Sequence, residues 1–224
     1  MSLFDEELTG LKEKILRMGA MVESAVKDSI NALVERDNDL AKRVIERDHQ
    51  VNALDVEIDE ESIRLIALMQ PKAGDLRLIT TAMKITTDLE RMGDMAVNIA
   101  ERALELNEEP LLKPYIDIPK MSSIAQGMTR DALDAFVKKD TKLAMEVIMR
   151  DDEVDDLKHQ VLNELLFFMI QDPTTASRAM KISFLAQYLE RIGDHATNIA
   201  EMVIYLVEGK IIRHTAPPPP SEKK

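Results

Sequence analysis

Polar and apolar positions are interleaved along tracts that contain no proline and are rich in Ala, Leu, Ile, Met, Glu and Lys. Aromatic residues make up only 4% of the chain, and this composition favours helices over strands. Proline and helix-capping residues interrupt the tracts at a few places. The pattern predicts helices over residues 4–36, 38–69, 73–108, 120–138, 141–171 and 173–209.

Local signals mark where these helices begin. Asp37 and Asp140 can each cap a new helix with a side-chain oxygen. Pro71 marks a further boundary. Asp172 stands before Pro173, an N-cap followed by proline at the first helical position.

The two halves of the chain are copies of each other. At an offset of 103 residues Asp37 matches Asp140 and Asp48 matches Asp151. At an offset of 100 residues LERMGDMAVNIAE, 89–101, matches LERIGDHATNIAE, 189–201, with 10 of 13 residues identical. This is the signature of an internal duplication.

The predicted fold is therefore all-α, with two tandem antiparallel three-helix bundles and six helices in total. The first repeat spans 1–108, a Pro-rich linker spans 109–119, the second repeat spans 120–210, and a Pro-rich tail without a core to join spans 211–224. Long antiparallel helices make elongated bundles, which can lie end to end or side by side.

The repeated stretch divides into two stripes when each residue is advanced by 100° from Leu89. Six apolar side chains form the inward stripe: Leu89, Met92, Ala96, Ile99, Ala100 and Ala103. Oxygen-bearing side chains form a separate outward stripe in both copies: Glu90, Asp94, Asn98 and Glu101, then Glu190, Asp194, Asn198 and Glu201. A solvated face requires only polarity, whereas the copies agree in residue type, so we expect ligands here; residual ancestry stays an alternative.

The second helix of each repeat offers further oxygen ligands at the spacing i and i+4. They are Asp48 and Asn52 in the first repeat, and Asp151 and Asp155 in the second. Carboxylates at this spacing can share one hard cation. Oxygen-only ligands favour iron, Mn, Mg or Ca over Zn.

Two other features of the motif have more than one explanation. Gly93 and Gly193 each lie in mid-helix, where glycine costs about 1 kcal/mol relative to alanine. A neighbouring helix or an ion can approach the backbone there. His195 follows Asp194, but its mate is Met95, so we expect an incidental surface histidine.

Composition removes several classes of function. The 41 acidic and 29 basic residues give a net charge of −12, which disfavours nucleic acid and anionic lipid as partners. The absence of Cys excludes disulfides and thiolate metal sites. The longest apolar run is LLFFMI, 165–170, far below the roughly 20 residues that span a bilayer, and the start does not resemble a signal peptide. We expect a cytoplasmic protein.

The paired motifs ERMGDMAVNIAE and ERIGDHATNIAE, each on the third helix of a repeat, resemble the signature of the PhoU family, accessory regulators of phosphate uptake in bacteria. The resemblance covers about residues 5–210. It implies a regulator, not an enzyme, that keeps the phosphate regulon off. Such a protein links the ATPase subunit of the phosphate ABC transporter to a sensor histidine kinase, and meets the membrane only through these partners.

The resemblance also implies a metal site in each copy. Some members of the family bind iron or other metal clusters through an E(D)XXXD motif, which here is Glu90 to Asp94 and Glu190 to Asp194. No organic cofactor is expected. Asn52 departs from the acidic residue that the family often shows.

Several alternatives stay open at this point. One alternative is a structural scaffold without metal, because acidic, helix-rich proteins are often scaffolds. Another is an accessory protein for a different phosphate carrier. A di-metal carboxylate enzyme needs two Glu-x-x-His motifs; Glu46 and His49 fit one, but their mates are Met149 and Asp152. The 14 Met residues suit a homodimer surface, although Met at helical spacing is more typical of a core.

Overall fold

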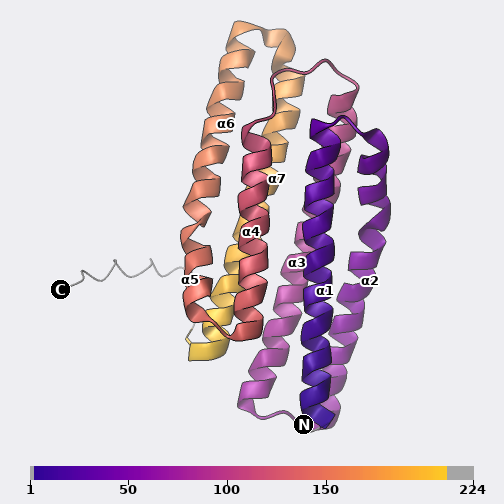
Figure 1. Cartoon of the computed structure of the whole chain (residues 1–224), viewed down its shortest axis with the longest axis vertical. Helices are drawn as coiled ribbons and strands as arrows, with labels where there is room; N and C mark the ends of the chain where they lie inside the picture. Colours follow the sequence, from indigo (N-terminus) through magenta and orange to yellow (C-terminus); the bar gives the residue numbers. More distant parts are fainter. Residues whose placement is uncertain (1–2, 211–224) are drawn as a thin grey trace, which may run out of the picture.

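The computed structural model describes residues 3–210 of the chain (Figure 1). All regular elements in this range are helices: α1 (Leu3–Val34), α2 (Asn38–Met69), α3 (Ala73–Asn107), α4 (Asp117–Lys138), α5 (Thr141–Met149), α6 (Asp151–Gln171), the short 3-10 helix η1 (Pro173–Thr175) and α7 (Ala176–Glu208). Because α5 and α6 follow one line, the described chain forms six rods. The predicted all-α fold of two three-helix repeats is confirmed.

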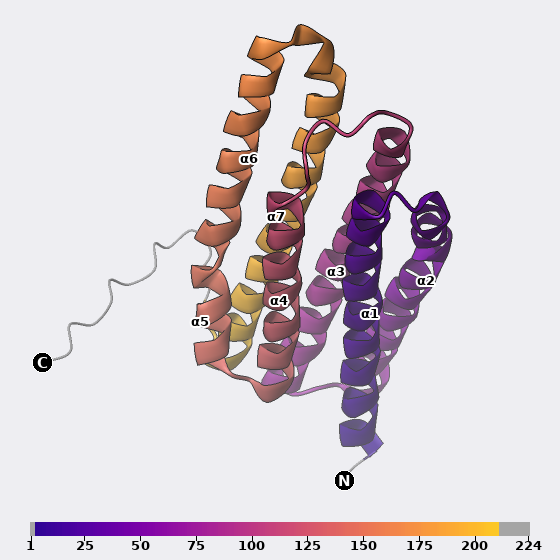
Figure 2. The same ribbon diagram turned by 45° about the horizontal axis from the view of Figure 1, so that its top comes forward.

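The two repeats lie side by side. Helices α1, α2 and α3 pack on one another, and so do α4, α5, α6 and α7. Figures 1 and 2 show α2 at one edge of the molecule and the α5–α6 rod at the other. Between the repeats α1 packs on α4 and α3 packs on α7. One apolar core runs through both repeats as a result.

The predicted helix starts are confirmed at three aspartates. Each of Asp37, Asp140 and Asp172 accepts a hydrogen bond from a backbone N–H two or three residues further on, at 2.9, 3.0 and 3.0 Å. These bonds satisfy N–H groups that have no partner within the helix. The signals were local, which is why sequence alone located them.

Some boundaries differ from the predictions. Helix α4 begins at Asp117 and not at residue 120, because Pro119 lies in the first turn, where a missing N–H costs nothing. The last rod opens with the 3-10 turn η1 and ends at Glu208, where Gly209 adopts φ 71°. The predicted tail, 211–224, lies outside the described residues.

The rod predicted over 141–171 is interrupted at Arg150. The Arg150 N–H donates to Val147 O at 3.0 Å, and Glu153 N–H donates to Arg150 O at 3.1 Å, so the chain tightens to three-residue turns there. The Arg150 side chain forms an ion pair with Asp131 of α4. In the first repeat the matching residue, Arg47, lies within the unbroken helix α2.

Candidate functional site

The repeated stretch occupies the middle of α3 and of α7. The side chains predicted to face inward on α3 are fully buried: Leu89, Met92, Ala96, Ile99, Ala100 and Ala103. The prediction of an inward apolar stripe is therefore confirmed, and it fixes how each helix is rotated. The motif carboxylates lie on the flank of each helix that faces α2 or α6, because they interact with charged side chains of those helices. These carboxylates are Glu90, Asp94, Glu190 and Asp194.

In the first repeat, four carboxylates from two helices repel one another. Partial burial raises the pKa of Glu90, and the charges of Asp94 and Asp55 raise it further. Burial and the charge of Asp48 likewise raise the pKa of Asp94. Asp48, Asp55, Glu90 and Asp94 are called the first acidic cluster below. Asn52 belongs to its rim, because its Nδ2 donates to Asp48 Oδ2 at 2.8 Å.

The second acidic cluster comprises Asp151, Asp155, Glu190 and Asp194. Burial, together with the charges of Asp194 and Asp155, raises the pKa of Asp151 to about 6. Burial, Glu190 and Asp155 also raise the pKa of Asp194. This cluster holds an internal cation, because Lys158 Nζ lies 2.6 Å from Glu190 Oε1 and 4.0 Å from Asp155 Oδ1.

Sequence reasoning missed Asp55 and Lys158, which occupy matching positions in the two repeats. The signal was available, because Asp55 follows Asp48 by seven residues and so lies two helical turns along the same face. Comparison at the offset of 103 then places a lysine where the first copy has an aspartate. The two clusters thus differ in charge.

The remaining predicted ligands lie further along the helices. In each copy the asparagine follows the first glutamate of the motif by eight residues, and the last glutamate follows it by 11. These separations are about 12 and 16 Å along the helix axis. One ion cannot be reached from both ends of such a stripe. These residues are Asn98, Glu101, Asn198 and Glu201.

The mid-helix glycines lie where the second helix of each repeat crosses. A Cβ built at Gly93 would lie 3.3 Å from Val51 Cγ1 and 3.6 Å from Asp48 Oδ1. A Cβ built at Gly193 would lie 3.5 Å from Asp151 Oδ1. Of the two explanations that the sequence left open, the structure shows the close helix, with an aspartate oxygen over the glycine in both copies.

The prediction that His195 is a surface residue is wrong. His195 is 8% exposed, and its Nδ1 lies 2.8 Å from Asp88 Oδ1 of α3. The pair joins the two repeats at the α3–α7 contact. The repeat comparison failed here because an interface between copies does not require the same residue in each.

The oxygen donors fit a hard cation in their chemistry. Among residues 3–210, no three His, Asp or Glu side chains already converge as a metal-binding group. Burial and mutual repulsion raise the carboxyl pKa values in both clusters, and a bound cation would favour the charged carboxylates against both effects. Hard cations take oxygen ligands of this kind, so the predicted ligands stay a prediction with a favourable donor set.

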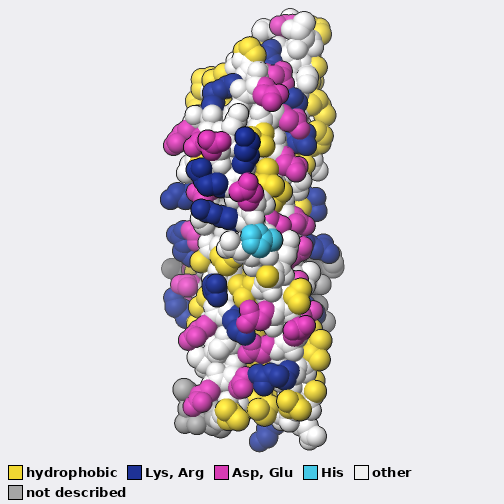
Figure 3. All heavy atoms as spheres, turned by 90° about the vertical axis from the view of Figure 1, so that its right-hand side faces the viewer, with side chains coloured by type: hydrophobic (Ala, Val, Ile, Leu, Met, Phe, Trp, Pro, Cys, Tyr) yellow, Lys and Arg dark blue, Asp and Glu magenta, His cyan; other side chains and the backbone are white. Residues whose placement is uncertain are grey.

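Other chemistry finds less support. Glu46 and His49 are both exposed on α2, whereas ligands of a helix-bundle di-metal centre project inward. On the side of the molecule where α2 lies, acidic, basic and apolar side chains are intermingled (Figure 3). That face shows no continuous basic patch of the kind that binds nucleic acid. Within the described range, no helix is both long and apolar enough to cross a membrane.

Comparison with known proteins covers both repeats. The model of the PhoU domain family matches residues 15–103 and 118–203. The phosphate-specific transport system accessory protein PhoU homolog of Aquifex aeolicus is 48% identical over 214 residues, 96% of either chain. The crystal structure of PhoU from Pseudomonas aeruginosa, 44% identical, gives a TM-score of 0.89 over 92% of this chain and 100% of that one. The phosphate transport system regulatory protein PhoU from Streptococcus pneumoniae, 29% identical, gives 0.86 over 93% and 98%.

Proposed function

This chain belongs to the PhoU family, and from that premise we propose that it is a metal-dependent negative regulator of phosphate uptake and of the phosphate regulon. Its relatives are accessory and regulatory proteins of phosphate-specific transport, not enzymes. The chain is accordingly an accessory protein of this transport system. The metal and the partners are the steps beyond that family role.

The paired acidic clusters carry the metal part of the proposal. Each combines side chains of the second and third helices of its repeat, and each contains carboxyl groups whose pKa is raised by burial and by like charges. Side chains so arranged bind a cation without a large change of the helices, because a rotation of each carboxylate brings its oxygens together. Asp48, Glu90 and Asp94 would hold an ion in the first repeat, and Asp151, Asp155 and Asp194 in the second.

The proposal of protein partners rests on the family role, which is accessory and not catalytic. A helical accessory protein without catalytic machinery acts by binding others, and we propose the ATPase subunit of the phosphate ABC transporter and the sensor histidine kinase. A cation bound at each acidic cluster would hold the second helix against the third in that repeat. Partner surfaces built on those helices would then depend on the metal.

A binding experiment tests both parts. The protein is stripped with a chelator, reloaded with Mn²⁺, and assayed for binding to the ATPase subunit and to the kinase cytoplasmic domain. The reloaded protein is expected to bind both, and Asp94→Ala with Asp194→Ala is expected to weaken both. The matched control is Glu13→Ala with Asp156→Ala, which removes two charges from exposed positions.

The outcomes separate the parts of the proposal. Failure of the loaded wild-type protein to bind either partner contradicts the regulatory link. Equal binding by the stripped and loaded proteins contradicts the metal requirement and leaves a scaffold that binds its partners without metal.

A further inference from the structure

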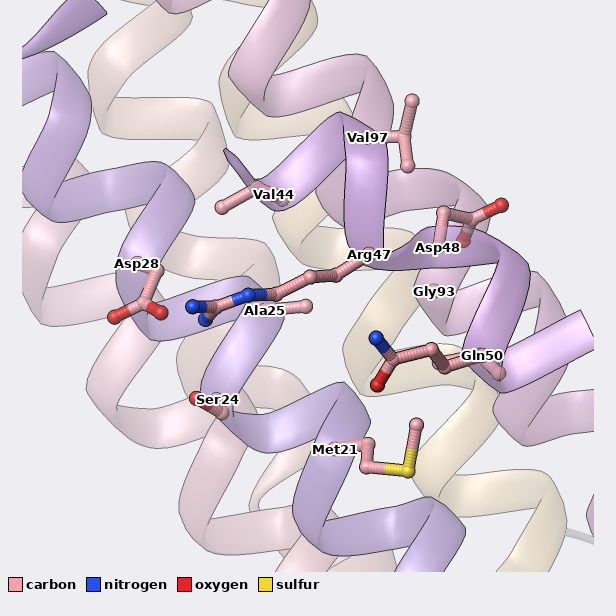
Figure 4. Close-up of a pocket in the computed structure, with 11 residues that line it drawn as sticks. Met21, Ser24, Ala25, Asp28, Val44, Arg47, Asp48, Gln50, Gly93 and Val97 are labelled. Carbon is pink, nitrogen blue, oxygen red and sulfur yellow. The ribbon is translucent and has the colours of Figure 1, made fainter. Parts of the chain in front are cut away.

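The first repeat contains a cleft of about 220 Å³ between its three helices. Its apolar walls come from Met21 and Ala25 of α1, Val44 and Val51 of α2, and Val97 of α3. Figure 4 shows these helices around the opening, with Gly93 and Asp48 at one side. Asp48 therefore borders both the cleft and the first acidic cluster.

The second repeat fills the same place with its own side chain. Met128 of α4 matches Ala25 at the offset of 103 residues. It is fully buried, and its Cε lies 3.8 Å from a Cβ built at Gly193. Gly93, Val44 and Val51 have the same residue types at the matching positions of the second repeat, whereas Val97 matches Thr197. At the position of Met128 the first repeat has only the methyl group of Ala25. The space that it leaves open therefore has the shape and apolar character of a methionine-sized side chain.

The arginine at the mouth of the cleft also differs between the repeats. Arg150 forms an ion pair with Asp131, and its Nη1 lies 3.7 Å from a Cβ built at Gly127. In the first repeat Ser24 matches Gly127. The Ser24 side chain therefore occupies, beside Arg47, the place that is empty beside Arg150. Arg47 extends towards Asp28 of α1 at the mouth of the cleft (Figure 4), and Asp28 is the residue that matches Asp131. The cleft therefore has apolar walls and charges of both signs at its rim, which is typical of a site that takes an apolar anchoring side chain.

The cleft continues into a groove, and this favours a protein segment over a small molecule. A neighbouring hollow shares Met21 and Gln50 with the cleft and extends between α1 and α2 past His49 to Leu54. A small molecule bound in the cleft would not contact the neighbouring hollow. A peptide segment that inserts one anchoring side chain into the cleft would place its adjacent residues along that hollow.

We infer that the first-repeat cleft is a socket for one methionine- or leucine-like side chain of a protein partner. The second repeat contains its own occupant and so is closed to such a partner. This inference rests on the proposed function for the identity of the partner class, since it assumes that the accessory protein binds the transporter ATPase or the kinase.

Filling the socket provides the test. Ala25→Met reproduces the second repeat inside the first, and the dissociation constants for the ATPase subunit and the kinase cytoplasmic domain are measured. We expect at least one to rise by roughly tenfold, the loss typical of a blocked anchor. The matched control is Ala20→Met, the same substitution at an exposed position of α1 outside the cleft. It is expected to leave both constants unchanged.

A second pair of variants guards against misfolding. Arg47→Ala removes a side chain from the mouth of the cleft and is expected to weaken binding of the same partner several-fold. Arg43→Ala, at an exposed arginine one turn earlier and outside the cleft, is not. The melting temperature of Ala25→Met is expected to equal or exceed that of the wild type, because the substitution fills a cavity.

Each other outcome overturns the inference. Unchanged binding by Ala25→Met and Arg47→Ala, with the wild type binding normally, contradicts the socket and leaves the proposed function intact. Absence of binding by the wild type contradicts both. A drop in solution mass on Ala25→Met identifies a second copy of this chain as the occupant. A molecule seen by native mass spectrometry on the wild type but not on Ala25→Met identifies a small ligand.

Discussion

The two clusters share three acidic positions but differ in the residues around them. In the first repeat the fourth carboxylate is Asp55, and burial with the charges of Asp94 and Asp55 raises the pKa of Glu90. In the second repeat the fourth is Asp155, which matches Asn52. There Lys158 stands at the position that matches Asp55 and neutralises Glu190 at 2.6 Å. The first cluster therefore has a greater need for an added cation, and the second already contains part of its counter-charge.

The packing between the helices also leaves the first repeat more open than the second. Met128 occupies in the second repeat the space that Ala25 leaves open in the first. A duplicated fold thus has one copy completed from within and one copy left open. The shared motif alone therefore does not make the two repeats equivalent. If one copy binds a partner or a cation more tightly, we expect the residues that differ between the copies to be the cause.

The largest expected effect comes from removing the methionine side chain that fills the core of the second repeat. Met128→Ala removes a fully buried side chain and should lower the free energy of unfolding by about 2–5 kcal/mol. Urea unfolding followed by circular dichroism measures it. Met149→Ala, at a residue that is 66% exposed, is the control and should change little. A loss below about 1 kcal/mol for Met128→Ala would mean that the residue does not fill the core.

Exchanging the charges of the clusters should exchange their affinity for metal. In an Asp94→Ala background, which leaves the second cluster to be measured, Lys158→Asp should raise the affinity for Mn²⁺ by roughly tenfold, because one more carboxylate replaces a cation. Asp55→Lys in an Asp194→Ala background should lower it by a similar factor. Calorimetric titration gives both values. Equal affinities before and after the exchange would show that Lys158 does not set the difference.

The raised pKa of Asp151, about 6, predicts a dependence of stability on pH in the metal-free protein. Between the ordinary value of 3.8 and about 6 the folded state binds the proton more tightly than the unfolded chain, so stability falls as the pH rises through this range. Asp151→Asn should therefore stabilise the protein at pH 7.5, by about 1 kcal/mol after allowance for solvent screening. At pH 3.5 it should have little effect. The exposed neighbour provides the control variant Asp152→Asn, and a gain that is the same at both pH values would refute the assignment.

The smallest effects concern the glycines. A Cβ at Gly193 meets its neighbours at ordinary contact distances of 3.5 Å and more, so Gly193→Ala should stabilise the helix by about 0.5–1 kcal/mol. Gly93→Ala should gain less, because its Cβ would lie 3.3 Å from Val51. Thermal unfolding of the two variants ranks them. The opposite order would show that the α2–α3 crossing is not the tighter one.

Sequence alone predicted the features whose causes are local or repeated. The helices were predicted because proline and aspartate caps act within a few residues, and the inward stripe because the apolar period fixes the rotation of α3. The residues that face the motif from the second helix were partly predicted, since Asp48 and Asp151 were chosen as oxygen ligands at the spacing i and i+4. Whether these side chains bind metal is still a prediction.

The features that sequence missed depend on which residues meet between elements. The Asp88–His195 hydrogen bond joins two different repeats, so no comparison of equivalent positions points to it. The break at Arg150 occurs at a residue that forms an ion pair with Asp131, a contact between two helices. The cleft beside Ala25 exists only because three helices surround a small side chain.

The most direct test of the metal-dependent regulator is the thermal stability of chelator-stripped protein with and without Mn²⁺, combined with elemental analysis of the protein as purified. We predict bound metal in the purified protein, a higher melting temperature on addition of Mn²⁺, and loss of that increase in Asp94→Ala with Asp194→Ala but not in Glu13→Ala with Asp156→Ala. A purified protein without metal, whose melting temperature does not respond to Mn²⁺, would contradict this prediction.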